Sequence, residues 1–339
     1  MRAIVVHGPR DVRVEQRDEP DLSPGDVRIR AAYVGICGSD LSYYRHGAVG
    51  DFTLREPLVI GHEVSGTVVE TASDVTTPVG SRVTVHPATP GESKPGIEDR
   101  PNIWPNSRYL GSAATWPHTQ GAASTTFVVR ADQVRPLPDD LPLDRAALAE
   151  PLAVAVHAVR RAGDLTGASV LVSGAGPIGQ MAIAAALDAG AREVAVADVL
   201  REPLALARKL GASYGFVVGE DSLPAEEFDV VLECSGAPAA LDQAIRSARR
   251  GGVVVQIGML PGEPRPYTLS VLCQREIDLR GSFRFDGELD HAVEILAHTP
   301  ALSAAITALY TPDHAEEAFA LAADPRQSCK VLIDLTGEA

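Results

Sequence analysis

The fold of this chain is constrained most by an alternation of short apolar strands and helical segments in its second half. The predicted strands cover residues 169–173, 193–198, 216–218, 229–233, 253–257 and 277–281, and the predicted helices between them cover residues 177–189, 203–210 and 238–248. Strands that read as continuous apolar runs between helices are typical of a parallel sheet with helices on both faces. The pattern therefore predicts a doubly wound α/β domain.

A glycine-rich turn follows the first of these strands, with the sequence Ser173-Gly174-Ala175-Gly176-Pro177-Ile178-Gly179. A match to this pattern alone is weak evidence, but its position between a strand and a helix is the one that a dinucleotide site requires. Gly174 allows the tight turn, Gly176 lets the backbone approach a pyrophosphate, and Gly179 lets the helix pack on the strand. The turn therefore predicts a nicotinamide dinucleotide as cofactor.

Asp198 ends the next predicted strand, where a carboxylate can accept hydrogen bonds from both ribose hydroxyls of NAD and would repel the 2′-phosphate of NADP. Arg201 lies close enough in sequence to weaken this preference. NAD is therefore the predicted cofactor. The predicted cofactor-binding residues are Gly174, Gly176, Pro177, Ile178, Gly179, Asp198 and Arg201.

The first part of the chain has a different pattern, with short β segments separated by proline and glycine. The predicted strands are residues 3–6, 27–34, 64–70, 82–85 and 126–129, and a proline-rich loop lies between His86 and His118. A helix is predicted to start at Glu150-Pro151, because proline is tolerated in the first turn of a helix. Beyond residue 286, two helical stretches (289–297 and 315–322) and a final strand (329–335) are expected to return to this β-rich domain.

Candidate metal ligands lie in two motifs of the β-rich part, Cys37-Gly38-Ser39-Asp40 and Gly61-His62-Glu63. A thiol, an imidazole and a carboxylate can hold Zn²⁺ while leaving one position open for a reacting oxygen. Adjacent residues of a regular strand point to opposite faces, so His62 and Glu63 can share a metal only if the chain bends, which Gly61 permits. Otherwise Glu63 would lie behind the metal, and Glu150 would complete the site directly or through water.

Ser39 and Asp40 follow the thiol and have predicted roles in the reaction. Ser39 is close enough to relay a proton from an alcohol substrate, and its alternative role is only to form the turn. Asp40 could orient His62 through the second ring nitrogen, because metal-binding imidazoles usually have such a partner. The candidate catalytic residues are therefore Ser39, Asp40 and Glu150. A metal that polarises an alcohol and a cofactor that accepts hydride together point to alcohol–carbonyl interconversion.

The sequence resembles the zinc-dependent medium-chain dehydrogenase/reductase family from end to end, in particular its branch of sorbitol and L-idonate 5-dehydrogenases. The motifs that carry the resemblance are Cys37-Gly38-Ser39-Asp40, Tyr43-Tyr44-Arg45-His46-Gly47, Gly61-His62-Glu63, Glu150-Pro151-Leu152, the glycine turn and Gly281-Ser282-Phe283-Arg284-Phe285. It implies a GroES-like β-rich catalytic domain (residues 1–152, completed by 287–339) and a Rossmann NAD-binding domain (residues 153–286). It also implies that Cys37, His62 and Glu63 hold a catalytic zinc, with Glu150 at the metal or just behind it.

The resemblance further implies a substrate site to which Ser39 also contributes. The predicted substrate-facing residues are Tyr43, Arg45, His46, Trp116, Arg284 and Phe285. Members of the L-idonate type are similar at Tyr43-Tyr44-Arg45-His46, whereas members of the sorbitol type tend to have an acidic residue in place of Arg45. A guanidinium suits a carboxylate, so we expect hydride transfer between a secondary hydroxyl of a polyol or sugar acid and NAD. The alternative interpretation of Arg45 is a surface residue that forms an ion pair with Glu56 or Asp51. The alternatives are a cyclitol, aminocyclitol or sorbitol substrate, or a non-catalytic NAD(H)-binding protein.

One loop departs from the pattern of the family. Many relatives bind a second, structural zinc through four cysteines in the loop that corresponds to residues 86–104. The residues at the expected thiolate positions here are Gly91, Lys94, Ile97 and Trp104. None of them can replace a thiolate. We therefore expect one catalytic zinc per chain and no structural zinc.

Composition limits the partners of the chain. A formal net charge of −15 disfavours nucleic acid and anionic membranes. The four cysteines lie far apart without CxxC spacing, which fits the reduced thiols of a cytoplasmic protein. No secretory signal is recognised near Met1, and no apolar run is long enough to cross a membrane. We expect a small-molecule polyol, aldonate or cyclitol as substrate and a homodimer or homotetramer as the assembly.

Overall fold

The computed structural model describes residues 1–263, 266–267 and 269–337. The chain forms two compact units. The first unit consists of Met1–Glu150, Ala292–Asp324 and Lys330–Ala339, and the second unit consists of Pro151–His291 and Pro325–Cys329. Among the described residues, none of the helices combines the length and the apolar character needed to cross a bilayer.

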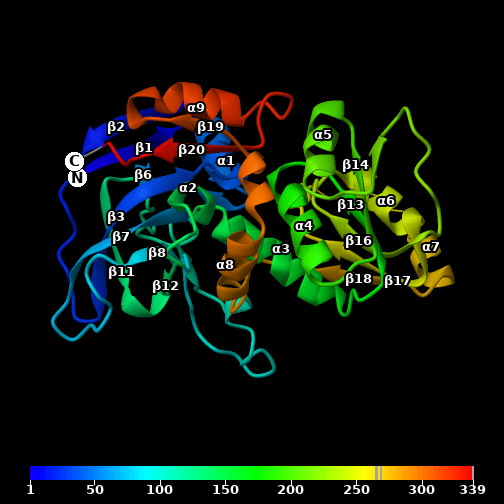
Figure 1. The fold of residues 1–339 in the computed structure, drawn as a ribbon, viewed down its shortest axis with the longest axis horizontal. Helices are drawn as coiled ribbons and strands as arrows, with labels where there is room; N and C mark the ends of the chain where they lie inside the picture. Colours follow the sequence, from blue (N-terminus) through cyan, green and yellow to red (C-terminus); the bar gives the residue numbers. More distant parts are fainter. Residues whose placement is uncertain (264–265, 268, 338–339) are drawn as a thin grey trace. The chain divides into compact units, whose positions relative to one another are not determined.

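The first unit is built on a seven-stranded sheet in which the strands follow the order β12-β8-β7-β3-β20-β19 and β11 also pairs with β3. Its strands are β1 (Arg2–Gly8), β2 (Asp11–Gln16), β3 (Asp26–Gly35), β4 (Ala48–Val49), β5 (Phe52–Thr53), β6 (Leu58–Val59), β7 (Glu63–Thr71), β8 (Arg82–Val85), β9 (Ala88–Thr89), β10 (Arg108–Tyr109), β11 (Thr126–Arg130), β12 (Val134–Pro136), β19 (Ile306–Tyr310) and β20 (Lys330–Asp334). Its α-helices are α1 (Gly38–His46), α2 (Leu143–Ala146) and α9 (Ala315–Ala322), with short 3₁₀ turns at Pro101–Ile103, Ala131–Gln133, Pro300–Ala305 and Pro312–His314. Ile4, Ile29 and Phe319 belong to one buried core. They lie on β1, β3 and α9, which Figure 1 labels.

The strands predicted in this region are all present. Strand β8 has the predicted bounds. Strands β1, β3, β7 and β11 extend one or two residues further at one or both ends, and β20 is one residue shorter at each end than predicted. Helix α1 and strand β19 were not predicted from the sequence. Helix α1 buries only Asp40 and Tyr43, and β19 alternates half-buried and exposed residues, so neither has a continuous apolar face that would indicate it.

The sheet brings the two ligand motifs together at the C-terminal end of β3. In the antiparallel ladder of β3 and β7, Gly35 pairs with Glu63, and in the ladder of β3 and β20 the same Gly35 pairs with Leu332. Cys37 lies two residues after the end of β3. Segments from the start, the middle of the β-rich region and the end of the chain therefore meet at one place.

The second unit contains a six-stranded parallel sheet in the order β15-β14-β13-β16-β17-β18, which is the doubly wound order 3-2-1-4-5-6 of dinucleotide-binding folds. Its strands are β13 (Ser169–Ser173), β14 (Glu193–Asp198), β15 (Tyr214–Val217), β16 (Phe228–Glu233), β17 (Ala248–Gln256) and β18 (Asp278–Gly281). Its helices are α4 (Pro177–Asp188), α5 (Arg201–Lys209), α6 (Pro238–Ser247) and α7 (Ser270–Gln274), while α3 (Ala149–Ala162) and α8 (Leu289–His298) each cross a boundary between the units.

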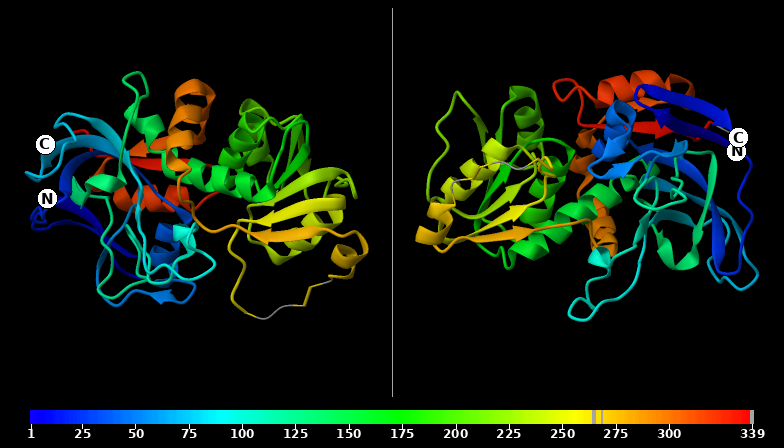
Figure 2. Two further views of the ribbon diagram at one scale, coloured as in Figure 1. Left: turned by 90° about the horizontal axis from the view of Figure 1, so that it is seen from below. Right: turned by 180° about the vertical axis from the view of Figure 1, so that it is seen from behind.

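Helices cover both faces of this parallel sheet. The crossovers through α4 and α5 run from β13 toward one edge, and the crossover through α6 runs toward the other edge. Because such crossovers are right-handed, α4 and α5 lie on one face and α6 lies on the opposite face (Figure 2). The second unit is therefore the doubly wound α/β domain predicted from the sequence, and the first unit is the predicted β-rich domain.

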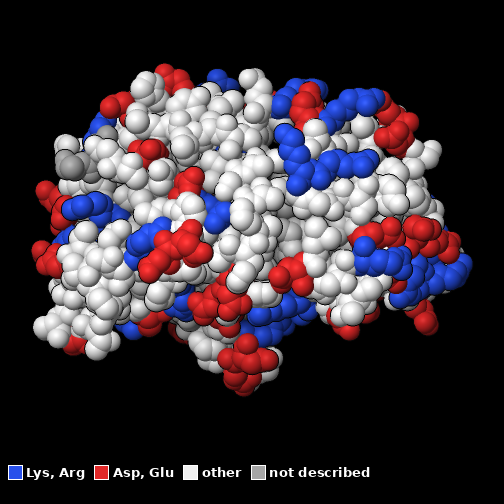
Figure 3. Space-filling model, viewed as in Figure 1, with Lys and Arg blue, Asp and Glu red and all other residues white. Residues whose placement is uncertain are grey.

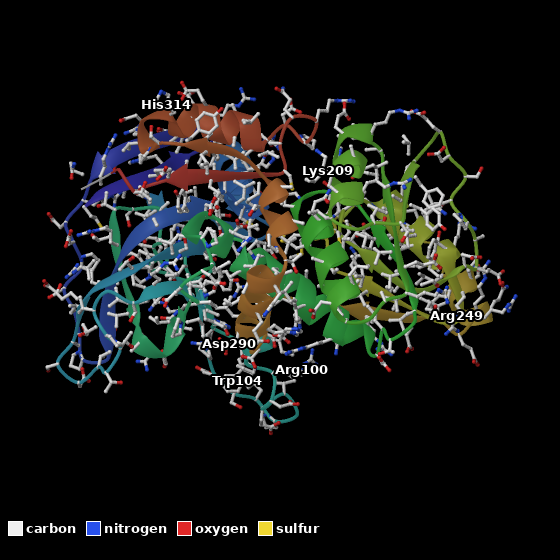
Figure 4. The ribbon with its side chains drawn as sticks, in the orientation of Figure 1. Arg100, Trp104, Lys209, Arg249, Asp290 and His314 are labelled. Carbon is white, nitrogen blue, oxygen red and sulfur yellow. The ribbon has the colours of Figure 1, made fainter. Side chains whose placement is uncertain are left out.

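Residues 91–107 form a lobe between β9 and β10, and Trp104 lies in it (Figure 4). Its ends are joined because the backbone N–H of Glu92 donates to the carbonyl oxygen of Pro105 at 3.0 Å. The indole N–H of Trp104 donates to the carbonyl oxygen of Ile97 at 2.7 Å. Two of the positions at which thiolates would be needed for a structural zinc are therefore joined by a hydrogen bond.

Charges of both signs lie on the surface. On the face shown in Figure 3, Lys and Arg side chains lie beside Asp and Glu side chains. Ion pairs such as Arg249–Asp229 and Arg250–Glu226 join neighbouring groups. Acidic and basic groups therefore neutralise one another at these places.

Candidate active site

Three side chains form a compact group of metal-ligating atoms in the first unit. One such atom from each of Cys37, His62 and Glu63 lies within 4.8 Å of the other two. Cys37 is half-buried, and His62 and Glu63 are buried. No other group of this kind is found in residues 1–263, 266–267 and 269–337.

The N-terminus of α1 fixes the position of Cys37. Cys37 is the N-cap residue of this helix, and its backbone N–H donates to Oδ2 of Asp40 at 2.9 Å. The other carboxylate oxygen of Asp40 accepts a hydrogen bond from the backbone N–H of Gly61 at 3.4 Å. Asp40 is completely buried. It therefore joins the two ligand-bearing segments through their backbones.

The relation between Asp40 and His62 differs from the sequence-based expectation. Nδ1 of His62 is buried and has no hydrogen-bond partner in the part of the chain that the structure describes. Asp40 uses both of its oxygens on backbone N–H groups instead. Asp40 therefore acts on the His62 ring through its charge and through the position of Gly61, not through a hydrogen bond to the ring.

Gly61 provides the bend between the two neighbouring ligands. Its φ is +96°, and β7 begins only at Glu63, so His62 lies outside the regular strand. A Cβ atom at position 61 would lie 2.7 Å from Cγ1 of Val34 and 3.1 Å from the backbone nitrogen of Ala123. The bend lets His62 and Glu63 belong to one group, which a regular strand would not allow.

Glu63 is held by a buried lysine from the last strand. Nζ of Lys330 lies 2.7 Å from Oε1 and 2.6 Å from Oε2 of Glu63. The same nitrogen donates to the carbonyl oxygen of Ile36 at 3.3 Å. Gly35 leaves room for this carboxylate, because a Cβ atom there would lie 2.1 Å from Oε2 of Glu63.

Glu150 lies outside the group of three ligands and has a different partner. The hydroxyl of Tyr109 donates to Oε1 of Glu150 at 2.5 Å. The Tyr109 ring also meets the His62 ring edge to face, with 5.5 Å between the ring centroids. Both Tyr109 and Glu150 are buried. Tyr109 therefore contacts both Glu150, through its hydroxyl, and the ring of His62.

Burial and charge make this cluster suited to a divalent cation. Burial disfavours the charged form of His62, but the nearby Cys37 and Asp40 outweigh it and raise the pKa of His62 to about 10. Burial raises the pKa of Asp40 and of Glu150, and the charge of Glu63 adds to both increases. The carboxyl groups of Asp40, Glu63 and Glu150 are thus buried close enough to influence one another's charge, and among them Lys330 bonds directly to Glu63. A thiolate, an imidazole and a carboxylate are also a donor set that zinc prefers.

The glycine turn lies at the C-terminal end of β13 in the second unit. Gly176 is the N-cap of α4, Pro177 is the first residue of that helix and Ile178 is the second. Gly174 has φ +94°, and a Cβ atom at Gly179 would lie 1.9 Å from the carbonyl oxygen of Gly174. The backbone N–H groups at this helix N-terminus form the kind of site that binds a pyrophosphate.

Asp198 and Arg201 lie beside this turn. Oδ2 of Asp198 accepts the backbone N–H of Ala175 at 2.7 Å, and Oδ1 accepts that of Leu200 at 2.8 Å. Arg201 is the first residue of α5 and forms an exposed ion pair with Glu220. Glu220 therefore offsets the positive charge of Arg201.

Helix α1 also carries Ser39 and Tyr43. Ser39 is half-buried in its first turn, two residues after Cys37. Tyr43 is buried, and its hydroxyl accepts the backbone N–H of Ala113 at 2.9 Å. Tyr43 therefore holds the segment that leads to Trp116.

The other predicted substrate-facing residues of the first unit are exposed. Arg45 and His46 lie in the last turn of α1, and Arg45 donates to the carbonyl oxygen of Ala323 at 3.0 Å. Arg45 forms neither of the ion pairs considered from the sequence, among the described residues. Trp116 is 58% exposed, and its ring meets that of His118 edge to face.

Arg284 and Phe285 belong to the second unit and follow β18. Arg284 has φ +52°, and its guanidinium carbon lies 4.9 Å from the centroid of the Phe283 ring. Phe285 is buried. A positive φ in a non-glycine residue is energetically costly, and such residues cluster at functional sites.

Comparisons with known proteins match both units. A family model for the alcohol dehydrogenase GroES-like domain matches residues 23–139, and one for zinc-binding dehydrogenases matches residues 177–298. The chain is 37% identical to the L-idonate 5-dehydrogenase (NAD(P)(+)) of Escherichia coli strain K12, over 97% of each chain. It is 35% identical to the sorbitol dehydrogenase of Bacillus subtilis strain 168, over 88% of this chain and 86% of that protein.

Solved structures agree with this relationship. The crystal structure of L-idonate 5-dehydrogenase from Escherichia coli matches with a TM-score of 0.92 at 35% identity, over 98% of this chain and 97% of that chain. The structure of 2R,3R-butanediol dehydrogenase from Bacillus subtilis matches with a TM-score of 0.87 at 28% identity, over 98% and 99%. The chain belongs to the zinc-binding dehydrogenase family. The resemblance recognised in the sequence is confirmed.

Membership of the zinc-binding dehydrogenases identifies the chain as an oxidoreductase that acts on hydroxyl groups and uses zinc and NAD(P). The cluster of Cys37, His62 and Glu63 has the chemistry of such a zinc site. The glycine turn has the geometry of such a cofactor site.

Two residues of this zinc-binding dehydrogenase were missed by the sequence analysis. Lys330 had a detectable signal, because a lysine that starts an otherwise apolar strand needs a buried partner. Tyr109 had none, since it lies within the proline-rich loop and its contact with Glu150 depends on the fold of that loop.

Proposed function

We propose that this zinc-binding dehydrogenase moves a hydride between a secondary hydroxyl of a polyol or sugar acid and NAD. The group formed by Cys37, His62 and Glu63 is the observation that carries the proposal. The names of two relatives, L-idonate 5-dehydrogenase and sorbitol dehydrogenase, support the substrate class. A cyclitol or aminocyclitol, which presents a similar run of secondary hydroxyls, is the alternative.

In this proposal Cys37, His62 and Glu63 bind the zinc, and Glu150 lies behind it. When bound there, zinc would supply a Lewis acid that lowers the cost of removing the hydroxyl proton, and NAD would supply the hydride acceptor. Ser39, in the first turn of α1, accepts the substrate proton and passes it outward. Asp40 keeps Cys37 and the bend at Gly61 in place through its two backbone hydrogen bonds.

A panel of polyols, aldonates and cyclitols tests the substrate class. NADH absorbance should rise with at least one polyol or aldonate. Turnover of cyclitols alone would favour the alternative. Absence of turnover with every class would favour a non-catalytic NAD(H)-binding protein.

NAD specificity depends on Asp198 in this proposal. Asp198→Asn removes the charge that repels a 2′-phosphate and keeps an oxygen for the N–H of Ala175. We expect the ratio of kcat/KM for NADP to that for NAD to rise about 10-fold or more, since hydrogen bonds to charged groups are worth about 1.5–3 kcal/mol. Asp188→Asn, an exposed change in the same unit, is the control. A wild-type enzyme that already prefers NADP would show that Asp198 does not set specificity.

Arg45 is proposed to bind the carboxylate of a sugar acid. Arg45→Glu should raise KM for aldonates roughly 10–150-fold more than KM for neutral polyols, which corresponds to about 1.5–3 kcal/mol. Arg13→Glu, which changes an exposed arginine of β2, should affect both classes equally. Equal effects of Arg45→Glu on both classes would place Arg45 outside the substrate site and favour a neutral polyol or cyclitol.

One zinc per chain is proposed, at the catalytic site. The 91–107 lobe contains no cysteine, and its carboxylates Glu92, Glu98 and Asp99 would hold zinc weakly without a thiolate. Elemental analysis of purified protein should therefore give one equivalent, which Cys37→Ser removes. Two equivalents, of which one survives Cys37→Ser, would contradict this.

A further inference from the structure

Lys330 is a buried cation with every donor used. Only 3% of the surface of Lys330 is exposed to solvent. A lysine ammonium has three N–H donors, and here they meet both carboxylate oxygens of Glu63 and the carbonyl oxygen of Ile36. Burying an ammonium costs several kcal/mol unless its partners are well placed. The geometry at Lys330 satisfies this condition.

The partners of Lys330 are parts of the ligand cluster. Ile36 is the residue before Cys37, and its backbone N–H donates to the carbonyl oxygen of Val331, the residue after Lys330. The lysine is thus anchored by β20 next to the end of β3. From that position it holds Glu63 by both oxygens, which fixes the rotation of the carboxylate plane.

Glu150 is held in a different way. Its partner is the neutral hydroxyl of Tyr109, which contacts one oxygen only. Glu150 also lies outside the group of ligand atoms formed by Cys37, His62 and Glu63. The two buried carboxylates are therefore positioned differently. Glu63 accepts bonds on both oxygens from a charged ammonium, whereas Glu150 accepts one bond on one oxygen from a neutral hydroxyl.

We propose that Lys330 is a positioning residue that fixes Glu63 as the third zinc ligand. The inference rests on the zinc site of the proposed function and adds to it a reason why Glu63, and not Glu150, completes the ligand set. Loss of Lys330 frees the carboxylate to rotate away from Cys37 and His62, and it leaves Glu63 buried without its cation. Residues that orient metal ligands typically change metal affinity 10–100-fold when mutated.

A double-mutant cycle on zinc retention tests this role. Zinc loss to a chromophoric chelator is measured for wild type, Lys330→Met, Glu63→Gln and the double variant. Lys330→Met should weaken zinc binding roughly 10–100-fold in the wild-type background and should have little further effect in the Glu63→Gln background. The double variant removes both charges of the pair. It therefore controls for misfolding caused by a single buried charge without its partner.

A second readout is the absorption of cobalt bound in place of zinc. The d–d bands should change in Lys330→Met and stay unchanged in Lys209→Met, because Lys209 is an exposed lysine of the second unit, which holds none of the three ligands. An equal effect of Lys330→Met in both backgrounds, in protein whose wild type holds zinc, would overturn the positioning role alone. A wild type that binds no zinc would overturn the proposed function itself.

Discussion

Cys37→Ser should abolish NAD-coupled turnover and leave NAD affinity unchanged. The ligand group belongs to the first unit and the glycine turn to the second, so damage to one should spare the other. Lewis-acid stabilisation is worth several kcal/mol, and each 1.36 kcal/mol is about a tenfold change in rate, so we expect a loss of at least about a thousandfold. His62→Ala should behave in the same way.

Initial rates and a fluorescence titration with NADH measure these two properties. Cys273→Ser is the matched control, because Cys273 is an exposed cysteine of the second unit. It should leave both rate and affinity unchanged. A parallel loss of cofactor affinity in Cys37→Ser would contradict the separation of the two sites.

Gly61→Ala should destabilise the protein and weaken zinc binding more than Gly80→Ala does. The two glycines have similar φ, +96° and +91°, so both substitutions carry a conformational cost of about 1–2 kcal/mol. Only at Gly61 does the new Cβ collide, with Val34 and Ala123, while at Gly80 it meets nothing within 4 Å. Overpacking adds about 1–3 kcal/mol, which gives about 2–5 kcal/mol in total for Gly61→Ala.

Chemical unfolding and zinc content measure the effect of these substitutions. The difference between the two variants isolates the collision from the backbone strain. Zinc retention in Gly61→Ala equal to that in Gly80→Ala would show that the bend does not set the position of His62 and Glu63.

The architecture was largely predictable from the sequence because its signals are local. The strands of the second unit are apolar runs, and β13 and β14 have the predicted bounds. Strand β17 begins earlier than predicted, at Ala248, because pairing with β16 extends across a glycine pair that reads as a turn. Helix α5 begins at Arg201, since the proline two residues later is still within the first turn.

The ligand group was predictable only in part. The need for a bend at Gly61 follows from the two-residue period of a strand, and the structure has that bend. The bonds of Lys330 to Glu63 and of Tyr109 to Glu150 depend on which distant strands and loops lie side by side. Which distant segments become neighbours is decided by tertiary packing. The spacing of residues in the sequence therefore does not predict these two contacts.

Removal and return of zinc is the most direct test of the central claim, that the group formed by Cys37, His62 and Glu63 binds a catalytic zinc for NAD-linked alcohol oxidation. NADH formation is followed with a polyol or aldonate that wild type oxidises, before chelation, after it, and after zinc or magnesium is added back. We predict that turnover falls with zinc content, returns with one equivalent of zinc and does not return with magnesium. Undiminished turnover by protein that elemental analysis shows to be free of zinc would contradict the account.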